Sequence, residues 1–141
     1  DKPVVVIQDF NCSINELWDA LTEPDKMKQW FFSEIDEFSP ETGFNTQFDV
    51  KAESGIFRHV WKVLKVIPHK ELCMTWRYEA YQGDSVLCFQ LNDMGNKSEL
   101  KVTHTVKEDF EDGVEEFSRD SCLGGWQYFI NSQLKNYLEK N

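Results

Sequence analysis

Three histidines are the side chains of this sequence best suited to proton transfer, because an imidazole titrates near neutral pH. His59 lies in a run of residues typical of a strand and His69 lies beside a predicted turn, and for both we expect a solvated imidazole. His104 shares its parity with Leu100 and Val102 and is expected to point inward. We favour a hydrogen-bonded structural role for His104, with contact to a polar ligand group as the alternative.

Thiol chemistry and metal binding would have to come from four cysteines, Cys12, Cys73, Cys88 and Cys122. They form no CxxC pair, and no histidine lies at the spacing of a zinc ligand, so we predict no metal site. Two disulfides are one possible state. We favour free buried thiols, because a chain of this length does not need disulfides to fold, and free thiols predict a reducing compartment such as the cytoplasm.

The carboxylates show no pair suited to general acid and base chemistry. Glu53, Glu79 and Asp84 fall near predicted strand ends or at outward positions, which gives no support to glycosidase chemistry. The sequence also has no GxSxG elbow, no glycine-rich phosphate loop and no HExxH zinc helix. We therefore predict no catalytic residue and no cofactor, and we favour a binding protein over an enzyme.

The aromatic residues are the strongest functional lead, because they make up 14% of the chain and several share the predicted interior. They either form one closed core or wall a pocket, since ligand pockets are mostly apolar with a few polar groups. The candidate pocket residues are Trp30, Phe48, Trp76, Phe89, His104, Trp126, Phe129 and Ile130.

The length and charge of the chain narrow the classes of partner. A chain of 141 residues fits one domain, and we expect residues 1–141 to fold as a single unit. The net charge of −10 argues against nucleic-acid binding, which requires basic residues to neutralise phosphates. No apolar stretch approaches the length of a membrane span and no signal peptide is recognised, so membrane insertion and export are not expected.

The first third of the chain predicts a strand followed by two short helices. Residues 4–7 are β-branched and indicate a strand, and Ser13 is a suitable helix N-cap. A helix with apolar residues at helical spacing follows, and Pro24 forces a break before a second short helix that carries Trp30.

The middle of the chain predicts an antiparallel meander. Between residues 33 and 106 apolar and polar residues alternate, which is typical of strands with one solvated face. Turn residues recur at positions 54–55, 68–69, 82–83 and 95–96, at intervals that favour hairpins over parallel units. Residues 55–67 carry apolar side chains at both parities, so we expect that strand to bend or to be covered on both sides.

The last third predicts a long C-terminal helix that covers the sheet. Acidic residues dominate residues 108–120, and the spacing of Asp112 and Glu115 matches a capping box at the helix start. Residues 122–138 then repeat apolar side chains every three or four positions. Gly124 and Gly125 indicate a close backbone approach, a helix bend or a mobile lid.

Several segments resemble the activator-of-Hsp90-ATPase-like family of the START-like, or SRPBCC, superfamily. The similar segments are residues 13–22 (SINELWDALT) with Glu23-Pro24 and Trp30-Phe31, residues 63–72 (VLKVIPHKEL) with Thr75-Trp76, and Gly125-Trp126 with Leu134 and Leu138. The matches span nearly the full chain. This resemblance implies an α+β helix-grip fold, in which a curved antiparallel sheet wraps a long C-terminal helix and two short helices follow the first strand.

The resemblance also implies what the protein binds. In the superfamily, sheet and helix enclose a cavity for apolar molecules, so we expect a small hydrophobic or aromatic ligand bound without chemical conversion. The alternative is a co-chaperone module that stimulates an Hsp90-like chaperone. A cyclase- or hydrolase-like enzyme in the same cavity is the weaker alternative. The ligand and the oligomeric state are not specified by the sequence.

Overall fold

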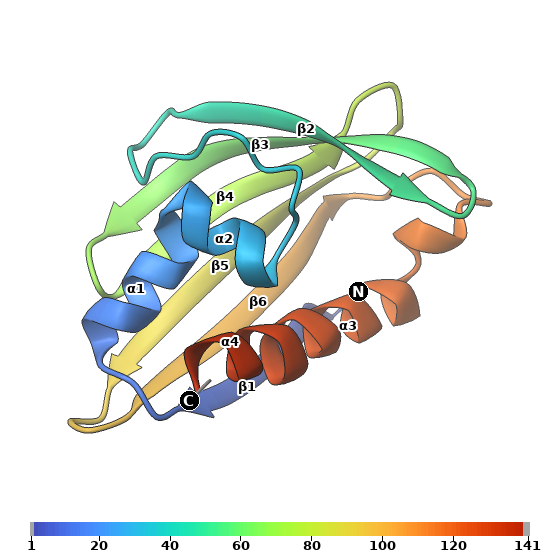
Figure 1. Cartoon of the computed structure of the whole chain (residues 1–141). Helices are drawn as coiled ribbons and strands as arrows, with labels where there is room; N and C mark the ends of the chain where they lie inside the picture. Colours follow the sequence, from blue (N-terminus) through green and yellow to red (C-terminus); the bar gives the residue numbers. More distant parts are fainter. Residues whose placement is uncertain (1, 140–141) are drawn as a thin grey trace.

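The computed structural model describes residues 2–139 and shows a curved sheet with helices on one side (Figure 1). The elements are β1 (Val4–Phe10), α1 (Ile14–Thr22), α2 (Pro24–Trp30), β2 (Asn45–Ala52), β3 (Gly55–Ile67), β4 (Glu71–Tyr78), β5 (Asp84–Asp93), β6 (Ser98–Glu108), a 3₁₀ turn η1 (Glu115–Phe117), α3 (Arg119–Trp126), a π-helical stretch η2 (Gln127–Leu134) and α4 (Lys135–Leu138). The last three run on as one C-terminal helix. This arrangement is the predicted α+β helix-grip fold.

The sheet has six antiparallel strands in the order β1-β6-β5-β4-β3-β2. From β2 to β6 each strand pairs with the next along the chain, and β1 closes the far edge against β6. All four predicted turns join consecutive strands of this meander. Figure 1 shows the C-terminal helix crossing the concave side of the sheet, with α1 and α2 covering one end.

The two N-terminal helices begin where the sequence predicts. Ser13 caps α1 by accepting a hydrogen bond from the backbone N–H of Glu16, and the Glu16 carboxylate accepts one from the backbone N–H of Ser13, which completes a capping box. Pro24 is the first residue of α2, where its missing N–H costs nothing. The Trp30 indole at the end of α2 donates to the carbonyl of Ala20 at 2.8 Å, which ties the two helices together.

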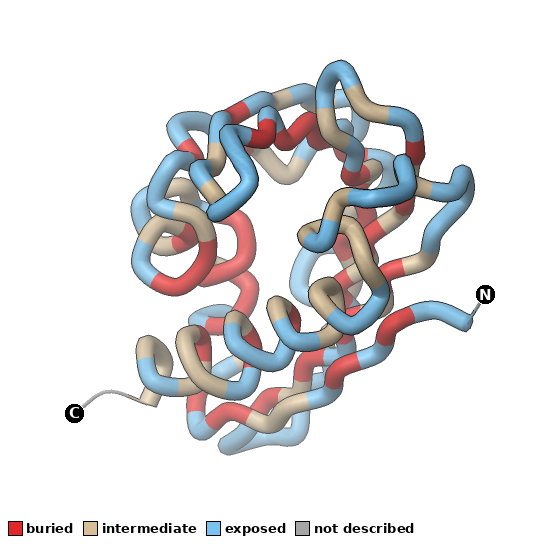
Figure 2. Tube along the Cα trace, turned by 90° about the vertical axis from the view of Figure 1, so that its right-hand side faces the viewer, coloured by how far each residue is buried: buried red, intermediate tan, exposed pale blue. Residues whose placement is uncertain are grey.

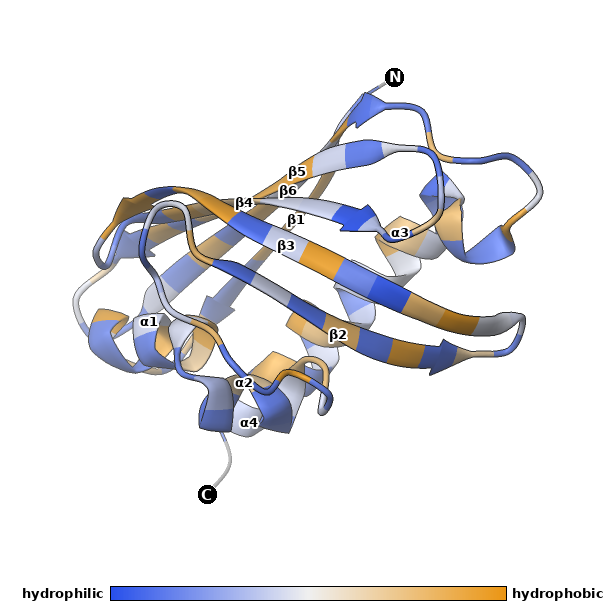
Figure 3. Cartoon of the chain, turned by 90° about the horizontal axis from the view of Figure 1, so that it is seen from above, coloured by the Kyte–Doolittle hydropathy of each residue, from blue (hydrophilic) through white to orange (hydrophobic). Residues whose placement is uncertain are grey.

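The strand with the ambiguous pattern, β3, is irregular in the structure. Phe57, His59 and Trp61 face the interior, whereas Val60 is buried on the opposite face, so this strand is covered on both sides in its middle. The register with β4 then shifts at a bulge between Val63 and Lys65. Figure 3 shows hydrophobic and hydrophilic residues alternating along β2 and β3.

The predicted start of the C-terminal helix is wrong. No helix begins at the proposed capping box of Asp112, because Gly113 has a φ of +84° and only the short turn η1 follows it. The helix begins at Arg119, where Ser118 is the N-cap and accepts a hydrogen bond from the backbone N–H of Ser121. Most of the acidic segment, from Asp109 to Glu116, therefore precedes the helix, and only Asp120 lies in its first turn.

One hydrophobic core joins the layers. It contains inward residues of all six strands, with Phe48 as the buried residue of β2, and residues of both N-terminal helices. The C-terminal helix contributes Trp126, Ile130 and Leu134, which are at most 3% exposed. Figure 2 shows buried and exposed residues alternating along the chain trace. No helix in the described part of the chain is long and apolar enough to cross a membrane.

Candidate functional site

A cavity of about 590 Å³ lies where the C-terminal helix, the sheet and the loop before the helix meet. Such a volume lies within the ordinary range for small-molecule sites, roughly 300–1,000 Å³. Its walls include Val4, Val50, Phe57, His59, Trp76, Tyr78, His104 and Val106 from the strands, Phe32 after α2, residues 109–114 and 116–118 of the loop, and Arg119, Ser121, Cys122, Gly125, Trp126 and Phe129 from the helix.

The predicted pocket residues divide into two groups. The first group, which lines the cavity, comprises Trp76, His104, Trp126 and Phe129. The second group, which lies in the packed core and not among the lining residues, comprises Trp30, Phe48, Phe89 and Ile130. The aromatic residues therefore do both things that the sequence allows: they close the core at the end covered by α1 and α2, and they wall the cavity nearer the loop.

Trp76 is one of the rings that connect the sheet to the helix. Its ring centroid lies 5.6 Å from that of Trp126 and 5.4 Å from that of Trp61. The ring of Phe129, on the C-terminal helix, packs against that of Phe31, which follows α2, with the ring centroids 4.9 Å apart. Aromatic rings therefore close the cavity on the side of α2. Aromatic pairs at these separations contribute packing energy beyond their buried area.

The two ring nitrogens of His104 are both occupied by protein partners. The Trp126 indole donates to Nδ1 at 3.0 Å. On the other side, the Ser85 hydroxyl donates to the carbonyl of Trp76 at 2.7 Å, so its oxygen accepts from Nε2, also at 2.7 Å. His104 is therefore the neutral tautomer with its proton on Nε2. This geometry supports the structural role for His104.

The charge of His104 is suppressed by its surroundings. The imidazole is 7% exposed, and burial lowers its pKa from 6.5 to about 4. A protonated ring would also turn Nδ1 into a donor that faces the Trp126 N–H, so the hydrogen-bond chain holds only in the neutral state. The chain joins β4, β5, β6 and α3 through neutral groups.

The prediction of a solvated His59 is wrong. This side chain is only 6% exposed and lies between Phe48, stacked at 5.2 Å, and Tyr78, edge-on at 4.8 Å. Its Nδ1 donates to the carbonyl of Phe57 at 3.2 Å, which leaves Nε2 as an acceptor without a partner in the described part of the chain. Burial lowers its pKa to about 4. The alternation of Phe57, His59 and Trp61 with Arg58 was the signal for an inward histidine.

Two further polar groups lie beside His59 in the cavity wall. Burial raises the pKa of Tyr78 to about 12, and the nearby Trp76 N–H opposes this shift. The indole nitrogen of Trp76 is nevertheless buried without a hydrogen-bond partner among residues 2–139, so it does not reach hydrogen-bond geometry with Tyr78. His59, Trp76 and Tyr78 are thus polar groups with unused hydrogen-bonding capacity at one wall of the cavity.

Charged residues gather at the loop end of the cavity. Asp109, Glu111, Asp112 and Glu116 are among the lining residues there, with Lys2 and Arg119 as the basic residues of the lining. The pKa of Glu116 is lowered by the hydrogen bond that its carboxylate accepts from the Ser54 hydroxyl at 2.7 Å. This end of the cavity therefore carries net negative charge.

The prediction of free thiols is wrong for two of the four cysteines. Cys73 and Cys88 are directly opposed on β4 and β5, with their Cα atoms 4.1 Å apart, and they form a disulfide. Cys12 and Cys122 are free. Burial raises the pKa of the Cys122 thiol to about 11, which disfavours a reactive thiolate in the cavity wall.

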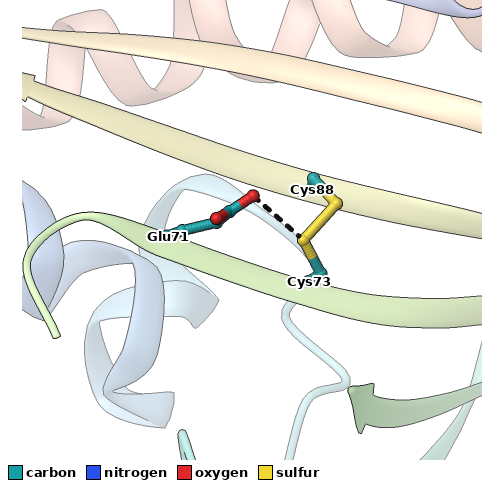
Figure 4. A group of neighbouring side chains, drawn as sticks. All are labelled: Glu71, Cys73 and Cys88. Atoms are coloured by element: carbon teal, nitrogen blue, oxygen red, sulfur yellow. Dashed lines mark hydrogen bonds between the residues drawn. A yellow bond between two sulfur atoms is a disulfide. The ribbon is translucent and has the colours of Figure 1, made fainter. Parts of the chain in front are cut away.

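One group of side chains has the spacing of metal ligands, and it consists of Glu71 and the two cysteines of this disulfide. Ligand atoms of Glu71, Cys73 and Cys88 lie within 4.8 Å of one another, and a Glu71 oxygen lies 3.6 Å from the sulfur of Cys73 (Figure 4). Metals bind thiolates, and these sulfurs are bonded to each other. Lys65 also pairs with the Glu71 carboxylate at 3.0 Å. The disulfide state does not hold a metal at this position.

A curved antiparallel sheet, a C-terminal helix across its concave side and a cavity between them define the helix-grip class of proteins, to which the START-like superfamily belongs. The model of the family described as "Activator of Hsp90 ATPase homolog 1-like protein" matches residues 11–139. The chain therefore belongs to this family.

Several solved structures share the fold. Protein CV1439 from Chromobacterium violaceum superposes with a TM-score of 0.81 at 15% identity, and the alignment covers 99% of both chains. The Aha1 dimer from Colwellia psychrerythraea gives a TM-score of 0.69 at 22% identity, covering 99% of this chain and 98% of that one. At such identities the likeness establishes the fold alone.

DynU16, a protein of the dynemicin biosynthetic locus, is similar over 99% of this chain with a TM-score of 0.79 and 22% identity. The chain spans only 48% of the length of DynU16. No curated protein matches the sequence closely enough to count as a relative.

Proposed function

We propose that the protein binds a small hydrophobic or aromatic molecule in the cavity between the sheet and the C-terminal helix, without converting it chemically. The observation that carries this proposal is a cavity of about 590 Å³ whose walls include the rings of Trp76, Trp126 and Phe129 from both layers. Ligand sites are mostly apolar with a smaller number of polar groups, and here apolar rings from both layers form one part of the wall while charged residues lie at the loop end.

Binding is favoured over catalysis because the cavity histidines lack a catalytic arrangement. His104 uses both nitrogens in protein hydrogen bonds, and neither it nor His59 pairs with a carboxylate among the described residues. A general base needs a partner that orients it and a proton within reach. A cyclase- or hydrolase-like activity is the weaker alternative, and any activity found should be lost in His104→Ala if this residue takes part.

A matched pair of glycine substitutions tests the proposal. Gly125 lines the cavity and Gly124 is exposed on the neighbouring position, and a Cβ at either site meets no atom within 4 Å. We expect Gly125→Leu to fill the cavity and weaken binding of a neutral naphthalene derivative, 2-naphthol, at least tenfold, while Gly124→Leu binds it like the wild type. Isothermal titration calorimetry measures both.

Native mass spectrometry of the purified protein complements this titration, because it would detect a ligand carried through purification. Absence of any bound molecule, together with no binding of 2-naphthol or of lipid-like probes to the wild type, would remove the proposal. Equal loss of binding in both glycine variants would also count against it, since only one of them changes the cavity.

Stimulation of an Hsp90-like chaperone is the second candidate. It is supported by the family to which the chain belongs and by the similarity to the Aha1 dimer from Colwellia psychrerythraea over nearly the full length of both chains. The test is the ATPase rate of purified Hsp90 with and without this protein. An unchanged rate at saturating protein would exclude this function.

A cytoplasmic location belongs to the same proposal, and the Cys73–Cys88 disulfide bears on it directly. Disulfides that persist are uncommon in reducing compartments. Alkylation of cells with a thiol reagent before lysis, followed by mass analysis, distinguishes the disulfide-bonded state of Cys73 and Cys88 from the reduced state. If the protein resides in the cytoplasm, we expect these two cysteines to be at least partly reduced there.

A further inference from the structure

His59 and Tyr78 place an imidazole and a phenol hydroxyl in the aromatic part of the cavity wall. The two residues are directly opposed partners of β3 and β4 and both line the cavity. Their rings meet edge-on, with centroids 4.8 Å apart. The pair lies in an apolar wall, where polar groups are normally satisfied.

The hydrogen-bonding roles of this pair are fixed by the protein. Because His59 Nδ1 donates to the carbonyl of Phe57, the neutral ring offers Nε2 as an acceptor. The phenol of Tyr78 keeps its proton, since burial raises its pKa, and therefore offers a donor as well as an acceptor. Neither Nε2 nor the phenol oxygen makes a side-chain hydrogen bond to another described residue, and neither is among the fully buried atoms left without a partner, so both remain accessible from the cavity that their residues line.

Trp76 adds a third unpaired group next to this pair. Its indole N–H is buried and without a partner in the described part of the chain, and its ring centroid lies 5.4 Å from that of His59. His104 makes a useful contrast, because its two nitrogens are already paired. Among the aromatic and histidine side chains of the cavity wall, unused hydrogen-bonding capacity is thus found at His59, Tyr78 and Trp76.

We propose that His59 and Tyr78 select a ligand that carries a neutral hydroxyl group on an aromatic ring. A hydroxyl donates one hydrogen bond and accepts others, so it can give its proton to His59 Nε2 and accept from the Tyr78 O–H. An ether or a hydrocarbon of the same shape leaves the histidine acceptor unpaired. A carboxylate can only accept, and Asp109, Asp112 and Glu116 in the cavity lining would repel its charge.

This inference rests on the proposed function, because it names the chemical class of the molecule in the same cavity. The proposed binding function and the preference for a hydroxyl group can be disproved separately. Binding of aromatic molecules without regard to a hydroxyl would support the proposed function and overturn the hydroxyl preference.

The experiment compares 2-naphthol with 2-methoxynaphthalene, which has the same ring system and keeps the oxygen but has lost the donor hydrogen. We expect the wild type to bind the naphthol more tightly by a factor on the order of ten to a hundred, because the ether strands the acceptor of His59. His59→Phe keeps a ring of similar size and removes the acceptor. In that variant the preference should vanish while the affinity for the ether changes less than about threefold.

Two more variants complete the test. Tyr78→Phe removes only the hydroxyl and should reduce the preference by a smaller factor, and it serves if His59→Phe does not fold. His69→Asn is the control, because His69 is an exposed histidine outside the cavity and has a φ of +67°, which asparagine tolerates. It should keep the wild-type preference.

Equal affinity of the wild type for the two probes would overturn the inference, and so would an unchanged preference in both His59→Phe and Tyr78→Phe. If no protein binds either probe, the inference falls together with the proposed function. A change in the ratio of the two affinities cannot arise from general loss of structure, since that would weaken both probes alike.

Discussion

At the level of single residues, His59 and His104 are the groups whose charge the fold controls most strongly. Both are buried and neutral, and the pKa of each is lowered from 6.5 to about 4. The unfolded chain therefore binds protons in this interval that the folded chain excludes. Stability is fully present above pH 6.5 and is lost as the pH falls toward 4.

We expect the free energy of unfolding to decrease between pH 6.5 and 5 by up to about 1.4 kcal/mol per pH unit for each of the two histidines. Urea denaturation at several pH values measures this slope. His104→Gln does not titrate and should flatten the slope. An equal slope in wild type and His104→Gln would contradict the assignment of a buried neutral His104.

The Cys73–Cys88 disulfide gives a second prediction at this scale. The bond closes a loop with a sequence separation of 15 residues between neighbouring strands. Replacing both cysteines by alanine should lower the free energy of unfolding by about 3 kcal/mol, because the unfolded chain regains the freedom that the bond removes. Denaturation with and without reductant measures the effect.

Reductant should bring the wild type close to the double variant and should not change the double variant itself. Cys122→Ala, which removes a free thiol, is the control and should remain sensitive to reductant. Four reactive thiols in the denatured protein without reductant would show that the bond is absent.

Individual residues were predictable where one pattern dominated. The alternation in residues 100–106 places His104 inside, as the structure shows. The same reasoning failed for His59, because the burial of Val60 on the opposite face hid the alternation of its strand. The pairing of Cys73 with Cys88 depends on the register of β4 against β5. A register is a property of two paired strands and cannot be read from the sequence of either strand alone.

At the level of elements, the C-terminal helix carries two glycines that its packing does not require. A Cβ at Gly124 or Gly125 would meet no atom within 4 Å, so the close backbone approach considered from the sequence does not occur. Gly125 instead faces the cavity, and its missing side chain leaves room there.

Gly124→Ala should therefore raise the free energy of unfolding by roughly 1 kcal/mol, because alanine restricts the unfolded chain and favours the helix. Thermal or urea denaturation measures the gain. Gly83→Ala is the matched contrast: its φ is +119° and an added Cβ would collide with the backbone and ring of Phe110, so it should destabilise. A loss of stability in Gly124→Ala would show that the helix is distorted at this residue.

The elements themselves were largely predictable, because their signals are local. Ser13, Pro24 and the four turns each mark a boundary that the structure has. The start of the C-terminal helix was misplaced because the two acidic residues that match a capping box, Asp112 and Glu115, lie on either side of Gly113, whose positive φ prevents a helix from starting there. The residue that caps the helix is Ser118, five residues after Gly113.

At the level of the whole molecule, charge and cavity act together. The chain carries a net charge of −10, and acidic residues at the loop end of the cavity add to this negative field. The size of the cavity could not be derived from the sequence, because it depends on how far the helix stands from the sheet. That distance is set by many side chains at once.

Anionic ligands should consequently bind more weakly than neutral ones, and salt should relieve the difference. We expect 2-naphthalenesulfonate to gain affinity several-fold when the salt concentration is raised, whereas 2-naphthol stays nearly unchanged, because salt screens exposed charges. Calorimetric titrations at low and high salt measure both. Replacing Asp109 and Asp112 by asparagine should reduce the salt effect, and an anion affinity that falls with salt would contradict this picture.

The close packing of tryptophans from the sheet and the helix also has an optical consequence. The rings of Trp61 and Trp76 lie 5.4 Å apart, and those of Trp76 and Trp126 lie 5.6 Å apart, with Trp76 and Trp126 in the cavity wall. Indoles this close exchange excitation energy, so the light that the protein emits comes from the whole cluster. A molecule that enters the cavity would quench or shift that emission, and the protein would report its own occupancy without a label.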